Sequence, residues 1–438
     1  MATAAQNYQA YLKMLDRSFT KLAKLEFLNP DGTVAFVLDN NPKNRRSGAF
    51  IQSGNLTCNK NNGKRRQLTV TLDNTDEAYT FDIEHLWFGQ QIAYYEGLIL
   101  PDGTEFYLPQ GVFEIENPSN EIEAGANTAT LDLVDKWANL DGTLFGNLED
   151  VYMVEAGTNI LDAIAATLLL DRYTMENGGD SPIDPTPPIF TDYYNDRTQT
   201  LTDGTVVSLI EAPHDFISNS TGTLGDVVTG LVEMIAGEVG YNAAGRLVVD
   251  PSQDDLLDTD KPVLWEFSEG KKSLIKVNYS PKITEVYNDI IVVGATSDTN
   301  LTARGRAQNT NPASGTCVSR IGRKTKRIEM PDYYSDQICQ DYAEWTLKRM
   351  TALAAEISVT CTQMFHIREN ELITIRREDK PGSPTERHLV TGFERPVAQT
   401  GAMTIRCVSV NDLPITEAGG VSQPMWRSAE ILTNEVLA

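Results

Sequence analysis

The four histidines, His85, His214, His366 and His388, are the first residues to consider for chemistry. No two of them have the spacing of paired metal ligands, and HExxH, which places two ligands on one helix face, is absent. His214 precedes Asp215, so this dipeptide could form an acid–base pair, but catalysis would also need a positioned nucleophile. We therefore expect no catalytic, cofactor-binding or metal-binding residues.

Other enzyme motifs are also missing from the sequence. GxSxG, the usual nucleophile elbow, is absent, and so are the Walker and dinucleotide-binding glycine loops. A glycosidase needs two carboxylates at a defined separation, and that separation depends on the folded chain. The 61 Asp and Glu residues therefore leave such a pair possible, but the sequence does not identify one. The sequence thus favours a protein that is not an enzyme and needs no cofactor.

The five cysteines are Cys58, Cys317, Cys339, Cys361 and Cys407. Their number is odd and none forms a CxxC pair, which argues against a disulfide framework. We expect buried, unpaired thiols and synthesis in a reducing cytosol.

The formal net charge of −24 argues against nucleic-acid binding through phosphate neutralisation, which needs clustered Lys and Arg. Basic residues do gather locally, at Lys43–Arg46, Lys60–Arg66 and Arg320–Arg327. They are either solvated hairpin surfaces or, in an acidic protein that self-assembles, patches that bind acidic surfaces of neighbouring subunits and fix how the subunits are arranged. The most apolar run, Ile160–Leu170, is shorter than the ~20 residues of a bilayer span, so we expect no membrane span.

The length of the chain and the order of its predicted helices and strands indicate several domains. The chain has 438 residues, and at ~100–200 residues per domain this length suggests two to four domains. A hydrophobic content of 41% is enough to form hydrophobic cores. The order is β, then α/β, then β. We expect an N-terminal helical arm over 1–23, a first β-barrel-like domain over 24–145, an α/β middle domain over 146–262, a second β-barrel-like domain with one helix over 263–412, and a C-terminal tail over 413–438.

The centre of the chain carries the clearest local pattern. Leu224, Val227, Val228, Leu231 and Ile235 recur with the spacing of one helix face. Glycines at 237 and 240 end this helix, and a hairpin with its turn at 242–245 follows. No catalytic group lies in this unit, so it is interpreted as architecture.

Strands and helices elsewhere follow from alternation and helical spacing. Asp-Gly-Thr recurs at Asp31, Asp102, Asp141 and Asp203 and predicts four turns. The polar segment Thr299–Ser314 is expected to be a mobile loop. Strands are predicted at Arg66–Asp73, Ile92–Leu100, Gly111–Glu116, Thr128–Val134, Val286–Gly294, Glu356–Cys361, Glu371–Arg377, His388–Phe393 and Met403–Val410, and helices over 5–23, from Thr158 to Arg172 and over Ser335–Ala355.

The two ends of the chain leave alternatives open. The N-terminal helix either packs on its own domain or docks on a neighbouring subunit. The tail over 423–438 carries Trp426, Ile431, Leu432 and Val436 outside any obvious core. It is either frayed or docked on a partner.

Several segments resemble the tail hub and tail-tip (baseplate hub) proteins of tailed bacteriophages. The order of these segments is more specific than any one of them. They are Leu68–Asp76, Leu98–Ile115, Ala129–Trp137, Gly225–Pro251, and the late helix followed by His366–Ile375 and Gly401–Val410. The resemblance implies a mainly β fold with an α+β middle region, in which two β-barrel-like domains are related by pseudo-symmetry.

The resemblance also implies a function. It predicts a structural virion protein at the tail tip or baseplate, assembled in the host cytoplasm. Its homotrimer would form a ring that joins the sixfold tail tube to a threefold tip and leaves a channel for DNA, without specific nucleic-acid binding. The partners implied are distal tail or tail tube proteins and tip, spike or fibre proteins. The alternatives are a distal tail or receptor-binding component and a cell-wall-degrading tail enzyme.

Overall fold

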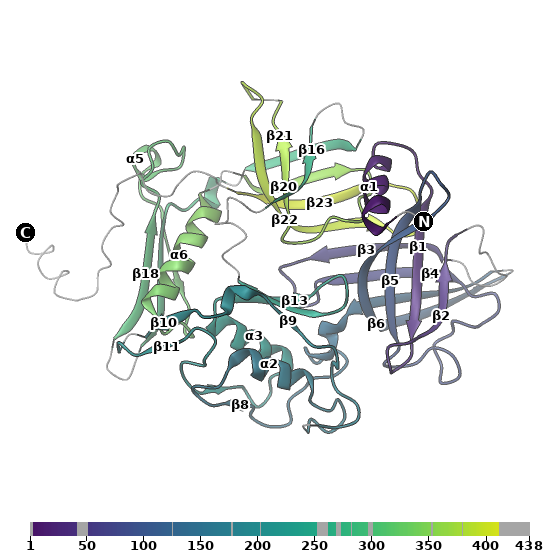
Figure 1. Cartoon of the computed structure of the whole chain (residues 1–438), viewed down its shortest axis with the longest axis horizontal. Coiled ribbons are helices and arrows are strands. Elements are labelled where there is room, and N and C mark those ends of the chain that lie inside the picture. The colour runs from purple at the N-terminus through teal and green to yellow at the C-terminus, as the bar shows by residue number, and fades with distance from the viewer. Residues whose placement is uncertain are drawn as a thin grey trace, which may run out of the picture.

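A computed structural model describes residues 3–41, 51–124, 126–176, 178–201, 203–251, 262–268, 273–281, 283–296, 301–351, 354–378 and 380–410. The predicted tail over 413–438 and the basic cluster Lys43–Arg46 lie outside these residues. Strands dominate the described part, and helices lie in the middle region, beside a small distal sheet and, near the N-terminus, against the large sheet (Figure 1). The expected fold class, mainly β with two β-barrel-like parts and an α+β middle region, is confirmed.

The largest element is a 13-stranded sheet built from both ends of the chain. Its main path runs β16-β20-β23-β22-β3-β4-β7-β6-β5-β1-β2, and β21 pairs with β22 and β15. The N-terminal strands are β1 Lys21–Leu28, β2 Val34–Asp39, β3 Ile51–Asn59, β4 Arg66–Asp73, β5 Gln91–Ile99, β6 Glu105–Glu123 and β7 Ala126–Asp135. The C-terminal strands are β15 Val263–Phe267, β16 Leu274–Pro281, β20 Ala354–Cys361, β21 Leu372–Arg376, β22 Thr385–Pro396 and β23 Met403–Ser409.

The junction between the two sets is the antiparallel pair of β22 and β3, with Phe393 opposite Cys58. Gly392 makes this close approach possible. A Cβ atom at Gly392 would lie 2.3 Å from the carbonyl oxygen of Cys58, which is backbone and cannot move aside. The two sets of strands therefore share one hydrogen-bonded ladder.

The remaining elements form the middle region and a distal unit. The middle region comprises η1 Lys136–Asn139, β8 Met153–Val154, α2 Ile160–Leu168, β9 Ile189–Phe190, η2 Asp192–Tyr194, β10 Thr198–Thr200, β11 Val206–Ser208, β12 Phe216–Ile217, α3 Leu224–Met234, β13 Gly237–Tyr241 and β14 Leu247–Pro251. The distal unit comprises η3 Ile283–Glu285, β17 Asp289–Thr296, β18 Thr302–Gln308, α5 Val318–Ile321, β19 Thr325–Glu329 and α6 Asp336–Met350. Its sheet has the order β18-β17-β19.

Two large buried clusters organise the packing. The first joins α1 (Ala4–Met14) and the N-terminal strands to β20–β23. The second joins α2, α3 and the β13–β14 hairpin to β17, β18 and α6. The five-part division of the chain made from the sequence stays a prediction.

The central helix and the four turns are confirmed. Thr223 caps α3 and forms a capping box with Asp226, which fixes the start of the helix. In each Asp-Gly-Thr the Asp side chain accepts a hydrogen bond from the Thr backbone N–H, at 2.8–3.0 Å. Gly237, predicted to stop α3, instead begins β13, because the helix has already ended at Met234.

Four predictions of local structure are wrong. The late helix ends at Met350, not at Ala355, because β20 begins at Ala354. The N-terminal helix ends at Met14, not at residue 23, because Lys21–Leu28 pairs along its whole length with β5. The helix predicted from Thr158 is capped by Asn159 and ends at Leu168, where the chain turns. The predicted mobile loop contains β18, whose inward residues Ala303, Gly305 and Ala307 are too small to give a hydrophobic signal.

Candidate functional site

The histidines that the sequence singled out do not come together into a site. The Asp215 carboxylate accepts a hydrogen bond from Ala156 N–H at 2.8 Å, and the His214 ring lies against Tyr334. His85 is bonded to Asp82 on an exposed loop, and His388 lies buried beside Ser409. Within the described ranges, no three His, Cys, Asp or Glu side chains gather as potential ligands of one metal ion. Among the helices that the structure describes, none combines the length and apolar character that a bilayer crossing requires.

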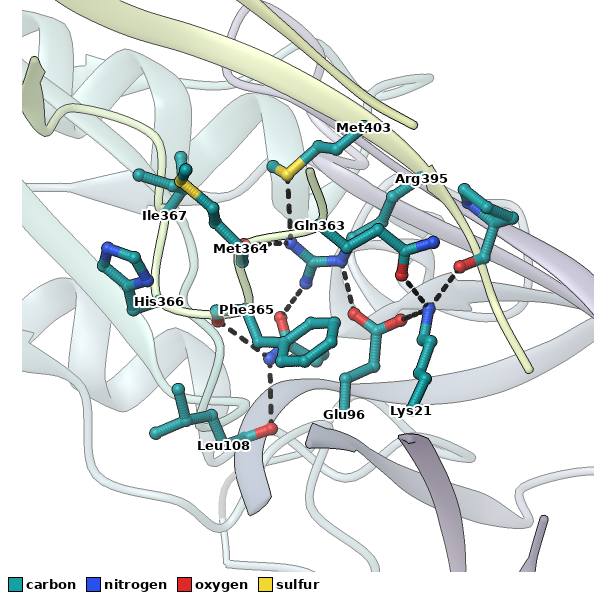
Figure 2. Close-up of polar contacts among 12 residues, drawn as sticks. Lys21, Glu96, Leu108, Gln363, Met364, Phe365, His366, Ile367, Arg395 and Met403 are labelled. Atoms are coloured by element: carbon teal, nitrogen blue, oxygen red, sulfur yellow. Dashed lines mark hydrogen bonds and ion pairs between the residues drawn. The ribbon is translucent and has the colours of Figure 1, made fainter. Parts of the chain in front are cut away.

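A buried junction of three charged side chains surrounds Glu96 inside the described protein (Figure 2). Glu96 lies on β5, Lys21 begins β1 and Arg395 lies on β22. Their side chains are 0%, 2% and 0% exposed. The carboxylate pairs with Lys21 Nζ through Oε1, at 2.8 Å, and with Arg395 Nε through Oε2. We call these three residues the ionic junction.

Polar groups from three further segments complete the ionic junction. Lys21 Nζ donates to Gln363 Oε1 at 2.5 Å and to the Pro396 carbonyl. Arg395 donates to the Met364 carbonyl at 3.1 Å and to the Gln110 side chain. Figure 2 shows both cations converging on the one carboxylate. Buried charges persist when they are paired and hydrogen-bonded, and here each cation has both an ion pair with Glu96 and further hydrogen bonds.

The electrostatics of the ionic junction explain why it stays charged. Burial lowers the pKa of Lys21, and Glu96 opposes that shift. Burial by itself would raise the pKa of Glu96, but Arg395 and Lys21 hold it below its ordinary value. The Lys21 ammonium donates two hydrogen bonds and forms an ion pair with Glu96, so its surroundings are those of a structural cation and not of a free amine nucleophile.

A cavity of about 280 Å³ lies beside the ionic junction and contacts Lys21 and Gln363. Its other lining residues include Phe19, Ile275 and Gly401, so most of its wall is uncharged. Arg17 and Lys21 are the charged residues in its wall, and Lys21 already pairs with Glu96. The cavity carries no functional assignment.

Helix α1 packs against the 362–371 segment through Tyr11. The Tyr11 hydroxyl accepts a hydrogen bond from Phe365 N–H and shares a second one with His366 Nδ1, both at 2.8 Å. Burial, with Arg368 and Arg395 adding to the effect, lowers the pKa of His366 to about 3, so the ring is neutral at neutral pH. Of the two alternatives for the N-terminal helix, the structure has it packed on its own chain.

The basic cluster Lys60–Arg66 forms a second buried charge network. Arg66 pairs with Glu369 at 2.5 Å and donates to the Tyr241 carbonyl at 2.6 Å. Lys60 pairs with Glu238 of β13 at 3.2 Å. Burial would raise the pKa of Glu369, but the Arg66 and Arg65 guanidinium groups hold it at about 2. The interpretation as a solvated hairpin surface is wrong here, because these cations tie the large sheet to the middle region.

Sequence reasoning missed both networks because the partners are far apart in the chain. Glu96 and Arg395 are 299 residues apart, and Arg66 and Glu369 are 303 apart. One local signal was present. Glu96 occupies the inward position of an alternation with Ile92, Tyr94 and Leu98, where an apolar residue is expected.

The cysteine expectation is confirmed, since all five thiols are free and buried. Burial raises the pKa of Cys339, Cys361 and Cys407 to about 12 in each case. Thiolates are the reactive form, so these three groups are unreactive at neutral pH.

Comparison with known proteins shows which solved structures share this architecture. The chain matches no family model and no curated protein. It does match solved structures along nearly all of its length. A tail protein from Neisseria meningitidis is 9% identical, with a TM-score of 0.55 over 90% of this chain and 97% of that one.

The chain has the fold of a phage tail protein. The 43 kDa tail protein of prophage MuSo2 from Shewanella oneidensis matches over 89% of this chain and 98% of its own, at 13% identity and a TM-score of 0.52. The prophage tail protein gp18 from Listeria monocytogenes matches over 91% and 96%, at 10% identity and a TM-score of 0.51. At these identities the likeness shows the fold, and in that respect the resemblance seen in the sequence is confirmed.

Proposed function

We propose that this chain is a structural tail hub, which forms a trimeric ring at the tail tip or baseplate of a phage particle. The observation that carries the proposal is the match of the tail-protein fold over 97% of the Neisseria meningitidis protein. The match covers both sets of strands and the middle region together. Because the two proteins share their fold over nearly their whole length, a similar mechanical role is better supported than it would be by one domain in common.

The interior of the chain supports a mechanical role. The two sets of strands share one ladder at β3 and β22, and the ionic junction fastens that ladder from inside. The Arg66–Glu369 pair fastens the middle region to the same sheet. These bonds hold distant parts of the chain in fixed relative positions, as a ring subunit that carries load requires.

The charge of the chain suits a conduit for DNA. One copy carries −24, so a trimer carries three times −24, or −72. Acidic side chains that face a lumen would repel the phosphate backbone and let DNA slide. The proposed partners are tail tube or distal tail proteins on one side and tip, spike or fibre proteins on the other.

Two measurements test the proposal. The mass of the purified chain in solution is expected to be that of a trimer, or of a monomer that trimerises with tail partners. Electron microscopy of tails carrying a labelled chain is expected to show a threefold ring at the end of the tube. Label at the periphery would favour a distal or receptor-binding component. A zymogram on peptidoglycan, expected to be blank, tests the enzymatic alternative.

A further inference from the structure

The distal sheet has one face open to solvent, and this face is basic in an acidic protein. Its other face packs on α6, where a Cβ at Gly305 would lie 2.2 Å from the Cys339 backbone. Residues on the open side alternate with these inward ones. Ile291 lies between Arg306 and Arg327 across the strands, and Val293 lies opposite Arg304. A cavity of about 280 Å³ lies on this side and is also lined by Arg323.

We call Ile291, Val293, Arg304, Arg306, Arg323 and Arg327 the arginine face. Asp289, which is buried, pairs with Arg306 at 2.8 Å and lies 3.7 Å from Arg323. Arg327 pairs with Glu329 at 3.2 Å, but both side chains are more than 60% exposed. Arg323 and Arg327 are 58% and 62% exposed and flank an apolar floor of Ile291 and Val293. These two exposed cations and the apolar floor suit an acidic partner that also has apolar side chains.

A surface of that kind lies elsewhere on the same chain, in the segment 74–90 between β4 and β5. This segment has no Lys or Arg and carries Asp76, Glu77, Asp82 and Glu84. Its apolar residues are unusually exposed. Ile83 is 79% exposed, Phe88 64% and Trp87 44%.

The aromatic residues of this segment are already packed together. The rings of Trp87 and Phe88 lie 5.1 Å apart, and Phe81 stacks on Trp87 at 5.3 Å. Tyr79 contacts Phe36 of β2, the strand that ends the main path of the large sheet. Exposed aromatic patches and uncovered edge strands are typical of surfaces that a partner covers. We call Asp82, Ile83, Glu84, Trp87 and Phe88, with Phe36, the acidic aromatic face.

The two faces lie at opposite ends of the molecule. Figure 1 places β18 near one end of the long axis and β2, which the 74–90 segment contacts, near the other. Complementary patches at opposite ends cannot meet within one chain. They suit a head-to-tail contact between copies, which closes into a ring when the rotation between copies allows it.

We propose that the acidic aromatic face of one copy binds the arginine face of the next. Phe88, Trp87 and Ile83 cover the apolar floor, while Asp82 and Glu84 pair with Arg323 and Arg327. The choice of a second copy as occupant rests on the proposed hub function. The inference goes further by naming the two surfaces that form the subunit contact.

Charge reversal with rescue tests the contact. Arg327→Glu and Glu84→Lys are each expected to weaken self-association of the full chain by about tenfold or more, measured by sedimentation equilibrium. The double variant R327E/E84K restores opposite charges in every contact and is expected to regain most of the wild-type affinity. Lys13→Glu, on the exposed side of α1, is the matched control and should change little.

Single cysteines give a second readout that does not depend on affinity. The native thiols are buried, so Ile83→Cys and Arg327→Cys would be the reactive ones. A mixture of the two variants is expected to form a disulfide between copies under mild oxidation, while I83C mixed with Lys13→Cys should form much less.

Several results would overturn the inference. They are unchanged association in R327E and E84K, a double variant no better than either single one, a mixture without the expected cross-link, or a wild-type chain that stays monomeric at every concentration. A threefold ring that persists in R327E would contradict the proposed subunit contact but not the proposed hub function. Label at the tail periphery would contradict the hub function itself.

Discussion

Glu96 of β5 and Arg395 of β22 form a fully buried ion pair between residues 299 positions apart in the chain. Lys21 pairs with the other oxygen of the same carboxylate, so a single anion balances two cations. The pair links β5 to β22 from behind the β3–β22 ladder and adds a charged contact to the hydrogen bonds that join the two sets of strands.

Replacing Glu96 by Gln should destabilise the protein strongly. The variant leaves Lys21 and Arg395 as two buried cations without a counter-charge, and breaking such a group costs about 3–5 kcal/mol. Urea unfolding followed by tryptophan fluorescence measures the loss. The triple variant K21M/E96L/R395M, which removes all three charges, should cost less than E96Q. Glu26→Gln, in a partly exposed pair with Lys24, is the control and should cost below about 1 kcal/mol. Equal losses in E96Q and E26Q would contradict this account.

Gly392→Ala should weaken the β3–β22 ladder. Its new Cβ would lie 2.3 Å from the Cys58 carbonyl, so one strand must shift, at about 1–3 kcal/mol for an overpacked site. The matched control is Gly315→Ala, because a Cβ there meets nothing within 4 Å and its backbone is ordinary. Amide hydrogen exchange should speed up in β3 and β22 in G392A only. Unchanged exchange in both variants would show that the junction tolerates the extra atom.

Stability should fall as the pH drops below about 6.5. Burial lowers the pKa of His366 to about 3 and of His388 to about 4, so the unfolded chain binds protons on both rings before the folded chain does. Asp135 acts in the opposite direction, because burial raises its pKa to about 6 and the folded chain takes up that proton first. From these three groups, the free energy of unfolding should lose about 1.4 kcal/mol per pH unit between pH 6 and 4.5.

His388→Gln provides the check on that sign. With His388 removed, the contributions of His366 and Asp135 nearly cancel, so the slope over the same window should fall by roughly 1 kcal/mol per pH unit. Urea titrations at pH 7.0, 6.0, 5.0 and 4.5 measure it. A slope that stays unchanged in H388Q would rule out His388 as a source of the pH dependence.

The five thiols should not react with thiol reagents in the native protein. All are buried, so Ellman's reagent should modify none of them in native buffer and all five in denaturant. Cys58, 0% exposed and bonded to Glu369, should be protected together with the Arg66–Glu369 network. Fast reaction of a native thiol would show local opening around it.

Local chemistry made much of the fold predictable. Thr223 and Asp226 form a capping box that is visible in the sequence, and each Asp-Gly-Thr turn needs only residues within the turn. Strand β4 was predicted with its bounds, because Leu68, Val70 and Leu72 alternate with polar residues. These signals need no knowledge of distant partners.

The rest depends on long-range contacts that leave little local trace. Strand β18 carries small residues inward because α6 approaches closely at Gly305, so its sequence resembles a polar loop. The burial of Arg66 and Arg395 depends on acceptors more than 250 residues away. In both cases tertiary packing decided the outcome.

The pairing of β3 with β22 also has a consequence for synthesis. Ribosomes release the N-terminal strands first, yet β3 finds one of its two neighbours only after residue 396 has emerged. Until then one edge of the nascent sheet stays open, a state in which strands readily pair with the wrong chain. Chaperones are thus expected to hold this polypeptide until β22 has emerged.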